Sequence, residues 1–270
     1  MDILEKIKNS KIEEVREKKA LYPVSLLQKS PYFQSDCVSF STYIKRPDKS
    51  GVIAEFKRKS PSEGFINQYA SVEEISIGYM QSGASGLSVL TDEVYFGGSS
   101  KDLSIAREFN YCPILRKDFI VDEYQIIEAR SIGADVILLI AEILTKEQIA
   151  TLSRTAQNMG LEVLMELHSE EHIEKISDNV NVVGVNNRNL KNFSVDIKYS
   201  LDIFDKIPKD KVKISESGIK NASDMLTLYE KGYDGFLIGT QFMKSDNPVK
   251  ACRSLIEEFE ELKLSLAEVK

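Results

Sequence analysis

Short apolar runs alternate with amphipathic segments along the chain after residue 50. Several runs, such as DVILLIA and VNVVGVN, are apolar almost throughout, which is typical of parallel strands covered on both faces. Each run is followed by a polar turn and a segment with helical spacing of its apolar residues. This order predicts a series of βα units. The predicted strands begin near Val52, Gly86, Pro113, Ala134, Leu161, Asn181, Lys211 and Asp234.

Start and stop signals support the predicted helices. In TKEQIATLSRTAQNMG the apolar residues recur on one helical face, and Thr145 and Gln148 form a capping box. Gly160 stands where a C-terminal cap belongs. Asp122 and Gln125 repeat the start signal before another segment. The segments between the strands are therefore predicted to be helices.

Eight strands alternating with eight helices predict an α/β fold, a closed (β/α)8 TIM barrel. The competing fold is an open doubly wound sheet, which usually has fewer strands and a G-x-G-x-x-G turn; no such turn follows a strand here. Residues 1–48 read as one charged helix and an irregular stretch, LYPVSLLQKSPYF. Because no linker separates them, we expect one domain over residues 1–270, with an N-terminal helical extension packed on the barrel.

Composition narrows the class of partner. The 270 residues carry a net charge of −7, with a pI near 5.2, which argues against a nucleic-acid partner. The three cysteines form no disulfide or zinc pattern and favour a reducing cytoplasm. The charged N-terminus does not resemble a signal peptide. No apolar run approaches the length of a transmembrane helix, so no membrane partner is expected.

Polar side chains gather where the predicted strands end. In a (β/α)8 barrel, the carboxyl ends of the strands and the following loops build the active site. Any one of these residues can be a solvated strand end, but their recurrence after every strand favours a functional site. They are Glu55, Lys57 and Ser60; Thr91 and Asp92; Arg116, Lys117 and Asp118; Glu142; Glu166 and His168; Asn186, Asn187 and Arg188; Ser215, Glu216, Ser217 and Gly218; and Gly239 and Thr240.

Two chemical roles follow from these positions. The small residues in ESGI and LIGTQFM end the seventh and eighth strands, where barrels commonly bind phosphate; the alternative is a pair of glycine turns. Lys57, Lys117 and Glu166 are candidates for proton transfer. A lysine among other cations and apolar walls has a lowered pKa, and we expect this of the acid.

The motifs IAEFKRKSPS, SVLTDEVYFGGS, PILRKDFI, EVLMELHSEEH, VGVNNRNL, ISESGI and GFLIGTQFM occur in order over roughly residues 50 to 245. Together they resemble indole-3-glycerol phosphate synthase, the ring-closing enzyme of tryptophan biosynthesis. The resemblance implies a decarboxylating and dehydrating closure of 1-(2-carboxyphenylamino)-1-deoxyribulose 5-phosphate, without a cofactor or metal. It implies one small phosphorylated partner, and leaves weak self-association or contact with other pathway enzymes open.

The resemblance also implies a role for each site residue. Lys117 would be the general acid, Glu166 the general base, and Lys57 a helper of the acid that also holds substrate charge. The remaining predicted site residues are Glu55, Asn186 and Glu216, which orient lysines and hydroxyl groups; Ser217, Gly218, Gly239 and Thr240, which hold the phosphate; Arg188 and Ser60, which face the anthranilate carboxylate; and Phe96, which forms an apolar wall.

Four other functions compete with this interpretation. HSEEH fits a zinc-protease pattern, but His168 ends a predicted strand and His172 follows it, so the two do not share a helix face. A Schiff-base aldolase would share the barrel, the phosphate site and an interior lysine. The isomerase one step earlier in the pathway would need a strand-end cysteine that is not apparent. A binding module without activity would have lost the acid and base residues.

Overall fold

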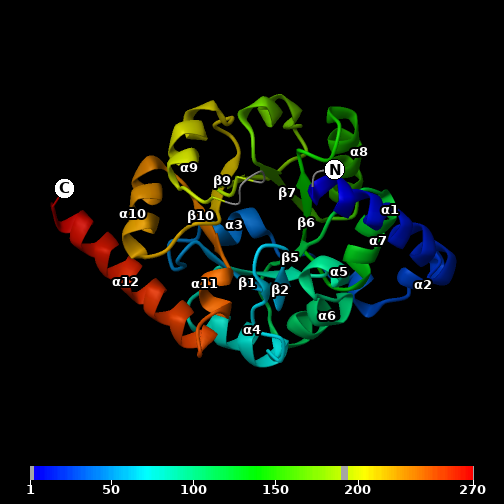
Figure 1. Cartoon of the computed structure of the whole chain (residues 1–270), viewed down its shortest axis with the longest axis horizontal. Coiled ribbons are helices and arrows are strands. Elements are labelled where there is room, and N and C mark those ends of the chain that lie inside the picture. Colours follow the sequence, from blue (N-terminus) through cyan, green and yellow to red (C-terminus); the bar gives the residue numbers. More distant parts are fainter. Residues whose placement is uncertain (1–2, 190–193, 270) are drawn as a thin grey trace.

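A closed barrel of parallel strands forms the centre of the computed structural model, which describes residues 3–189 and 194–269 (Figure 1). The strands follow one another around the barrel in chain order, and the last pairs with the first. Each begins within two residues of its predicted start, which confirms the (β/α)8 fold. They are β1 (Val52–Phe56), β4 (Gly86–Leu90), β5 (Ile114–Lys117), β6 (Val136–Ile140), β7 (Glu162–Leu167), β8 (Val182–Asn186), β9 (Val212–Glu216) and β10 (Gly235–Ile238).

Helices surround the barrel (Figure 1). Both predicted capping boxes are present, at Asp122 and at Thr145. Between β7 and β8 the chain forms a 3₁₀ helix, η2 (Glu170–Lys175), so the expectation of an α-helix there was wrong. This connection is short, and a 3₁₀ helix covers more length per residue than an α-helix does. The α-helices are α4 (Val72–Gln81), α6 (Ser100–Phe109), α7 (Glu123–Ser131), α8 (Lys146–Asn158), α9 (Lys198–Ile203), α10 (Ala222–Lys231) and α12 (Pro248–Val269).

Several short elements lie in the loops and were not predicted. The loop after β1 folds into a hairpin of β2 (Lys59–Ser60) and β3 (Gly64–Phe65). The helices α5 (Glu93–Phe96) and α11 (Thr240–Met243) follow β4 and β10, and η3 (Phe204–Lys206) extends α9. Elements this short do not complete a hydrophobic period, so the pattern of apolar residues gives no signal for them.

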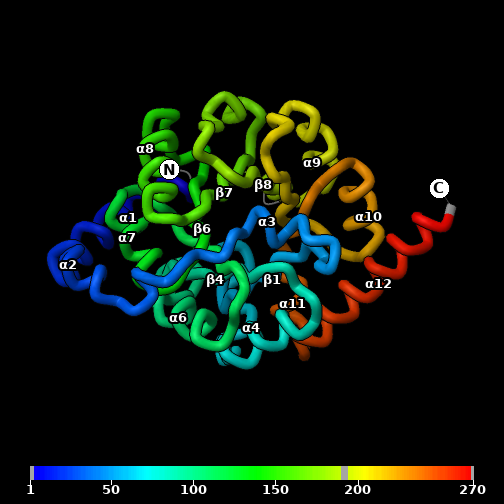
Figure 2. Tube along the Cα trace, turned by 180° about the vertical axis from the view of Figure 1, so that it is seen from behind, coloured from blue at the N-terminus to red at the C-terminus, as the bar shows by residue number. Residues whose placement is uncertain are grey.

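The N-terminal extension reaches both ends of the barrel. It comprises α1 (Ile3–Leu21), α2 (Val24–Leu27), η1 (Pro31–Gln34) and α3 (Phe40–Ile44). Helix α1 lies beside α7, whereas α3 crosses the opposite end, where Phe40 and Ile44 pack against the first residues of β4 and β10 (Figure 2). The stretch expected to be irregular is therefore partly helical, because Pro23 and Pro31 each stand at a helix start.

A buried lysine fastens α1 to the barrel. The Lys11 side chain is 1 % exposed, and its Nζ lies 2.9 Å from carboxylate oxygens of both Asp92 and Asp118. Arg116 also reaches Asp118, at 3.1 Å. Burial favours the neutral acid, but Arg116 and Lys11 outweigh it and hold the pKa of Asp118 well below its usual range. Helix α1 is thus fixed at the carboxyl ends of β4 and β5.

In the described part of the chain, no helix combines the length and the apolar composition needed to cross a bilayer.

Replacement of Lys11 tests this anchor. In Lys11→Met, Asp92 and Asp118 lose a buried cation, and we expect the free energy of unfolding to fall by about 3 kcal/mol. The matched control is Lys6→Met, at an exposed position of the same helix, which should change it by less than about 0.5 kcal/mol. Denaturant unfolding measures both, and equal stabilities for the two variants would contradict the anchor.

Candidate active site

A cavity of about 580 Å³ opens at the carboxyl ends of the strands, within the range of small-molecule sites. Of the predicted strand-end residues, Thr91, Asp92, Arg116, Glu142, Asn187 and Ser215 are not among its lining residues. Every residue to which the resemblance gave a role lines it, although these roles remain predictions. They are Glu55, Lys57, Ser60, Phe96, Lys117, Glu166, Asn186, Arg188, Glu216, Ser217, Gly218, Gly239 and Thr240.

Strand alternation explains the charges at the end of β1. Glu55 and Lys57 are two residues apart, so both side chains point to the same side of the barrel wall. The Lys57 ammonium donates to Glu55 Oε1 at 2.6 Å. The hydroxyl of Ser88, on the neighbouring strand β4, lies 3.4 Å from the other oxygen of Glu55. The apolar run of β1 therefore ends in an ion pair inside the cavity.

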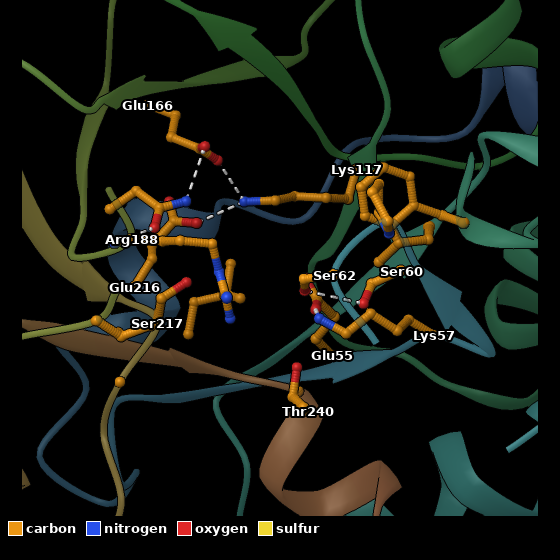
Figure 3. Close-up of a pocket in the computed structure, with 18 of the residues that line it drawn as sticks. Glu55, Lys57, Ser60, Ser62, Lys117, Glu166, Arg188, Glu216, Ser217 and Thr240 are labelled. Carbon is orange, nitrogen blue, oxygen red and sulfur yellow. Dashed lines mark hydrogen bonds and ion pairs between the residues drawn. The ribbon is translucent and has the colours of Figure 1, made fainter. Parts of the chain in front are cut away.

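Lys117 occupies the middle of the site. Its ammonium extends across the cavity between two carboxylates, at 2.7 Å from Glu166 Oε2 and 2.5 Å from Glu216 Oε2 (Figure 3). Burial alone would lower the pKa of Lys117, but Glu166, Glu216 and Glu55 raise it above the ordinary lysine value. The expectation of a lowered lysine pKa was therefore wrong, because the nearest charges are carboxylates and not cations.

The two carboxylates beside Lys117 differ in their partners. Glu166 Oε1 also accepts a hydrogen bond from the Asn186 amide at 3.0 Å, and Asn186 is oriented by the Arg188 backbone N–H. Burial opposes ionisation of Glu166, but Lys117 and His168 lower its pKa to about 2. Glu166 is therefore an ionised carboxylate at neutral pH.

Glu216 shares Lys117 but lacks the other donors. Its Oε1 is buried, and no hydrogen-bond partner for it occurs among the described residues. Burial raises the pKa of Glu216 to about 7, Lys117 opposes this rise, and the charges of Glu166 and Glu55 add to it. Glu166 thus has more hydrogen-bond donors and a lowered pKa, whereas Glu216 has fewer donors and a raised pKa.

Two glycines provide space for the carboxylates. A Cβ on Gly184 would collide with Glu216 Oε1, and a Cβ on Gly239 would collide with Glu55 Oε1. Gly239 was assigned to the phosphate, and the structure shows that it also provides space for Glu55. Gly184 was not assigned to the site, because the requirement for a glycine there appears only when β8 and β9 are paired and Glu216 lies beside it.

The turn after β9 has an uncommon backbone conformation. Ser217 has a φ of 66° and is the only non-glycine residue with positive φ among the described residues, and Gly218 follows with a φ of 77°. The Asn187 amide donates to the Ser217 carbonyl at 3.0 Å and holds this turn. Such conformations persist where the surrounding structure enforces them, and they cluster at ligand sites.

Two lysines that line the cavity near this turn were not predicted from the sequence. Lys220 and Lys244 line the cavity beside Gly239 and Thr240. Lys244 also forms an ion pair with Glu63 of the β2–β3 loop at 2.8 Å. Both lysines follow the strand ends by several residues, so the rule that barrel sites form at strand ends gives no signal for them.

The apolar side of the cavity combines the barrel with α1. The rings of Phe96 and Phe119 lie 6.0 Å apart, and Ile3, Leu4 and Ile7 of α1 complete the lining. The contribution of α1 was not predicted, since nothing in its sequence shows which of its residues face the cavity.

The two histidines of HSEEH bind one carboxylate. Nδ1 of His168 and Nδ1 of His172 lie 3.0 Å and 2.8 Å from oxygens of Glu142. His168 also lines the cavity; it was predicted at a strand end, but without a role. No metal-binding group of three or more His, Cys, Asp or Glu side chains occurs in the described ranges.

The fold and the cavity define the class of protein. It is a (β/α)8 barrel whose cavity holds paired lysines and glutamates beside a turn of small residues. The family model for indole-3-glycerol phosphate synthase matches residues 4–255, and the chain belongs to this family.

Curated relatives agree with the family. The indole-3-glycerol phosphate synthase of Bacteroides thetaiotaomicron is 47 % identical over 208 residues, covering 77 % of this chain and 80 % of that protein. The enzyme of the same name from Campylobacter jejuni subsp. doylei is 38 % identical and covers 94 % and 100 %. That from Sulfurisphaera tokodaii is 46 % identical and covers 78 % and 85 %.

Similar solved structures show the fold alone. One is 3-hexulose-6-phosphate synthase from Salmonella typhimurium, with a TM-score of 0.63, 11 % identity and coverage of 78 % of this chain and 99 % of that one. Another is a tryptophan synthase complex from Pyrococcus furiosus, with a TM-score of 0.57, 13 % identity and coverage of 79 % and 99 %. Both support the barrel.

A substitution at Gly184 tests the packing of Glu216. In Gly184→Ala, the new methyl group displaces the Glu216 carboxylate, and we expect the free energy of unfolding to fall by about 1 to 3 kcal/mol. In a Glu216→Ala background the same substitution should cost less than half as much, because the colliding oxygen is gone. Denaturant titration of the four proteins measures this, and an equal cost in both backgrounds would refute the contact.

Proposed function

We propose that this chain catalyses the conversion of 1-(2-carboxyphenylamino)-1-deoxyribulose 5-phosphate into indole-3-glycerol phosphate, carbon dioxide and water, a step of tryptophan biosynthesis. The observation that carries the proposal is the Lys117 ammonium held between Glu166 and Glu216 in the cavity of a chain that matches the family over residues 4–255.

The cavity suits a substrate with an anion at each end. We assign the phosphate to the turn of Ser217 and Gly218 and to Gly239 and Thr240, beside Lys220. The opposite end of the substrate carries the anthranilate carboxylate and ring, for which Arg188 and Ser60 supply donors and Phe96 an apolar face. These local groups allow a chain of net charge −7 to bind an anion.

Lys117 is the proposed general acid. As the aromatic carbon attacks the ketone, a carbon–carbon bond forms and the carbonyl oxygen becomes an alkoxide, which takes a proton from the Lys117 ammonium. An alkoxide is a stronger base than an amine, so a raised lysine pKa does not prevent this transfer. Cleavage of the bond to the carboxylate then releases carbon dioxide, and its electron pair restores the aromatic ring.

Glu166 is the proposed general base of the dehydration. The hydroxyl group leaves as water with a proton from an acid, a role that Lys57 assists, while Glu166 accepts the proton that the substrate loses. Donation by Lys117 removes a positive charge from beside Glu166, and the pKa of Glu166 rises as a result. The acid step thereby prepares the base for the next step.

Glu55, Asn186 and Glu216 are proposed to orient these groups. Glu55 holds Lys57, Asn186 holds Glu166, and Glu216 holds Lys117 together with Glu166. Fixed geometry of this kind is required because a misplaced acid or base loses most of its effect. The proposed steps use side chains of this chain alone, so no cofactor enters them.

A cytoplasmic site of action is part of the proposal. Cys37, Cys112 and Cys252 are all free thiols, which is consistent with a reducing compartment.

The Schiff-base alternative is disfavoured by the charge of Lys117. An aldolase lysine attacks as a neutral amine, whereas two carboxylates keep Lys117 protonated. Borohydride added with the substrate separates the two functions. It should leave the activity intact if Lys117 acts as an acid, and it should inactivate the protein covalently if a Schiff base forms.

Removal of the acid tests the proposal directly. Fluorescence of the indole product should show turnover of the carboxyphenylamino substrate by the parent protein and a loss of at least about a hundredfold in Lys117→Ala. The control is Lys146→Ala, at an exposed lysine on α8, which should keep the parental rate. Equal rates for Lys117→Ala and the parent would remove Lys117 from the mechanism.

A further inference from the structure

The imidazole ring of His168 lies between two carboxylates. Its Nδ1 is 3.0 Å from Glu142 Oε2, and its Nε2 is 3.2 Å from Glu166 Oε1. The side chain is only 7 % exposed. The backbone N–H of His168 donates to Glu142 Oε1 at 2.8 Å, so the Glu142 carboxylate is fixed against both the ring and the backbone.

Between two ionised carboxylates, this geometry favours a charged ring. An ionised carboxylate only accepts hydrogen bonds, and a neutral imidazole has a single N–H. In either neutral tautomer one ring nitrogen would direct a lone pair at a carboxylate oxygen. An imidazolium donates to both Glu142 and Glu166, so it is the form that fits both contacts.

A proton on Glu142 Oε2 or on Glu166 Oε1 would also fit these contacts, by donating to a ring nitrogen. Other donors favour the ionised form of each carboxylate. The His168 backbone N–H donates to Glu142, and Lys117 and the Asn186 amide donate to Glu166. Burial opposes ionisation, but the pKa of each of the two acids is lowered, so the proton belongs to the ring.

We propose that His168 is a permanent imidazolium in the resting protein and acts as a positioning residue for Glu166, with Glu142 as its anchor. The ring holds the Glu166 carboxylate ionised and directed into the cavity. Because Lys117 loses its charge when it gives up its proton, His168 is the cation that remains beside Glu166 during the following step. The role of Glu166 as a base rests on the proposed function; the charge of His168 does not.

The surroundings of the ring favour its positive charge. Burial alone would lower the pKa of His168, but the hydrogen bond to Glu142 and the charges of Glu166, Glu142 and Glu216 raise it above its usual value. The titratable and charged groups around the pair are Glu142 after β6, Glu166 on β7, Glu216 on β9, Lys117 on β5, His172 on η2 and Tyr199 on α9.

Nuclear magnetic resonance tests the charge without substrate. The chain has two histidines, so in a His172→Gln variant labelled with ¹⁵N-histidine every ring signal belongs to His168. We expect both ring nitrogens to remain protonated well above the ordinary histidine pKa of about 6.5. A Glu142→Gln substitution in this background should lower that titration point by about one pH unit or more. A neutral ring at pH 7 before that substitution would overturn the proposal.

Kinetics test the action on Glu166. Gln replaces His168 with a neutral donor, so in His168→Gln the pKa of Glu166 should rise. The acid limb of the kcat/KM profile should then move to higher pH by about one unit or more, with kcat lowered. His172→Gln is the control and should keep the parental profile. A purely structural role would lower the rate at every pH without moving the limb, and that outcome would overturn the proposal.

Two further comparisons keep the outcomes distinct. If circular dichroism shows that His168→Gln does not fold, Glu142→Gln supplies the kinetic test, since it weakens the charge of His168 without removing the ring. It should move the acid limb of the kcat/KM profile in the same direction. An unmoved limb would again overturn the proposal. If the parent shows no synthase activity, the proposed function fails, while the resonance experiment still decides the charge of His168.

Discussion

The site depends on one buried cation, the Lys117 ammonium, held by carboxylates from two other strands. Lys117 ends β5, Glu166 lies on β7 and Glu216 ends β9, so the three meet only because the barrel is closed and its registers are fixed. Charges removed from water are costly unless they are paired and hydrogen-bonded. The pairing stabilises the charges and keeps Lys117 protonated and Glu166 ionised at neutral pH, as the proposed acid and base require.

Much of the surrounding structure serves this arrangement. Gly184 leaves room for Glu216, Asn186 directs Glu166, and His168 adds a second positive charge next to the proposed base. Lys11 fixes α1 against Asp118, the residue directly after Lys117. The N-terminal helix therefore closes the apolar side of the cavity and also fastens the loop that follows Lys117.

The sequence predicted the parts of the structure that local pattern controls. Strand positions followed from apolar runs and helix positions from caps. Most cavity residues followed from the rule that barrel sites form at strand ends, and Phe96 followed from the family resemblance. What could not be predicted depends on partners distant in the chain. The direction of the Lys117 pKa required knowledge that Glu166 and Glu216 lie beside it. The buried role of Lys11 and the need for Gly184 likewise appear only after α1 docks and β8 pairs with β9. Leu190, within the motif VGVNNRNL, lies outside the described residues.

The most direct test of the central claim is the ionisation of Lys117 in the substrate-free protein. Lysine labelled with ¹³C at Cε reports the charge of each ammonium by its chemical shift, and Lys117→Ala identifies the signal. We predict that Lys117 remains protonated beyond the ordinary lysine pKa of about 10.4, because Glu166 and Glu216 lie beside it. A titration of this signal near neutral pH would show that the two carboxylates do not hold the charge of Lys117.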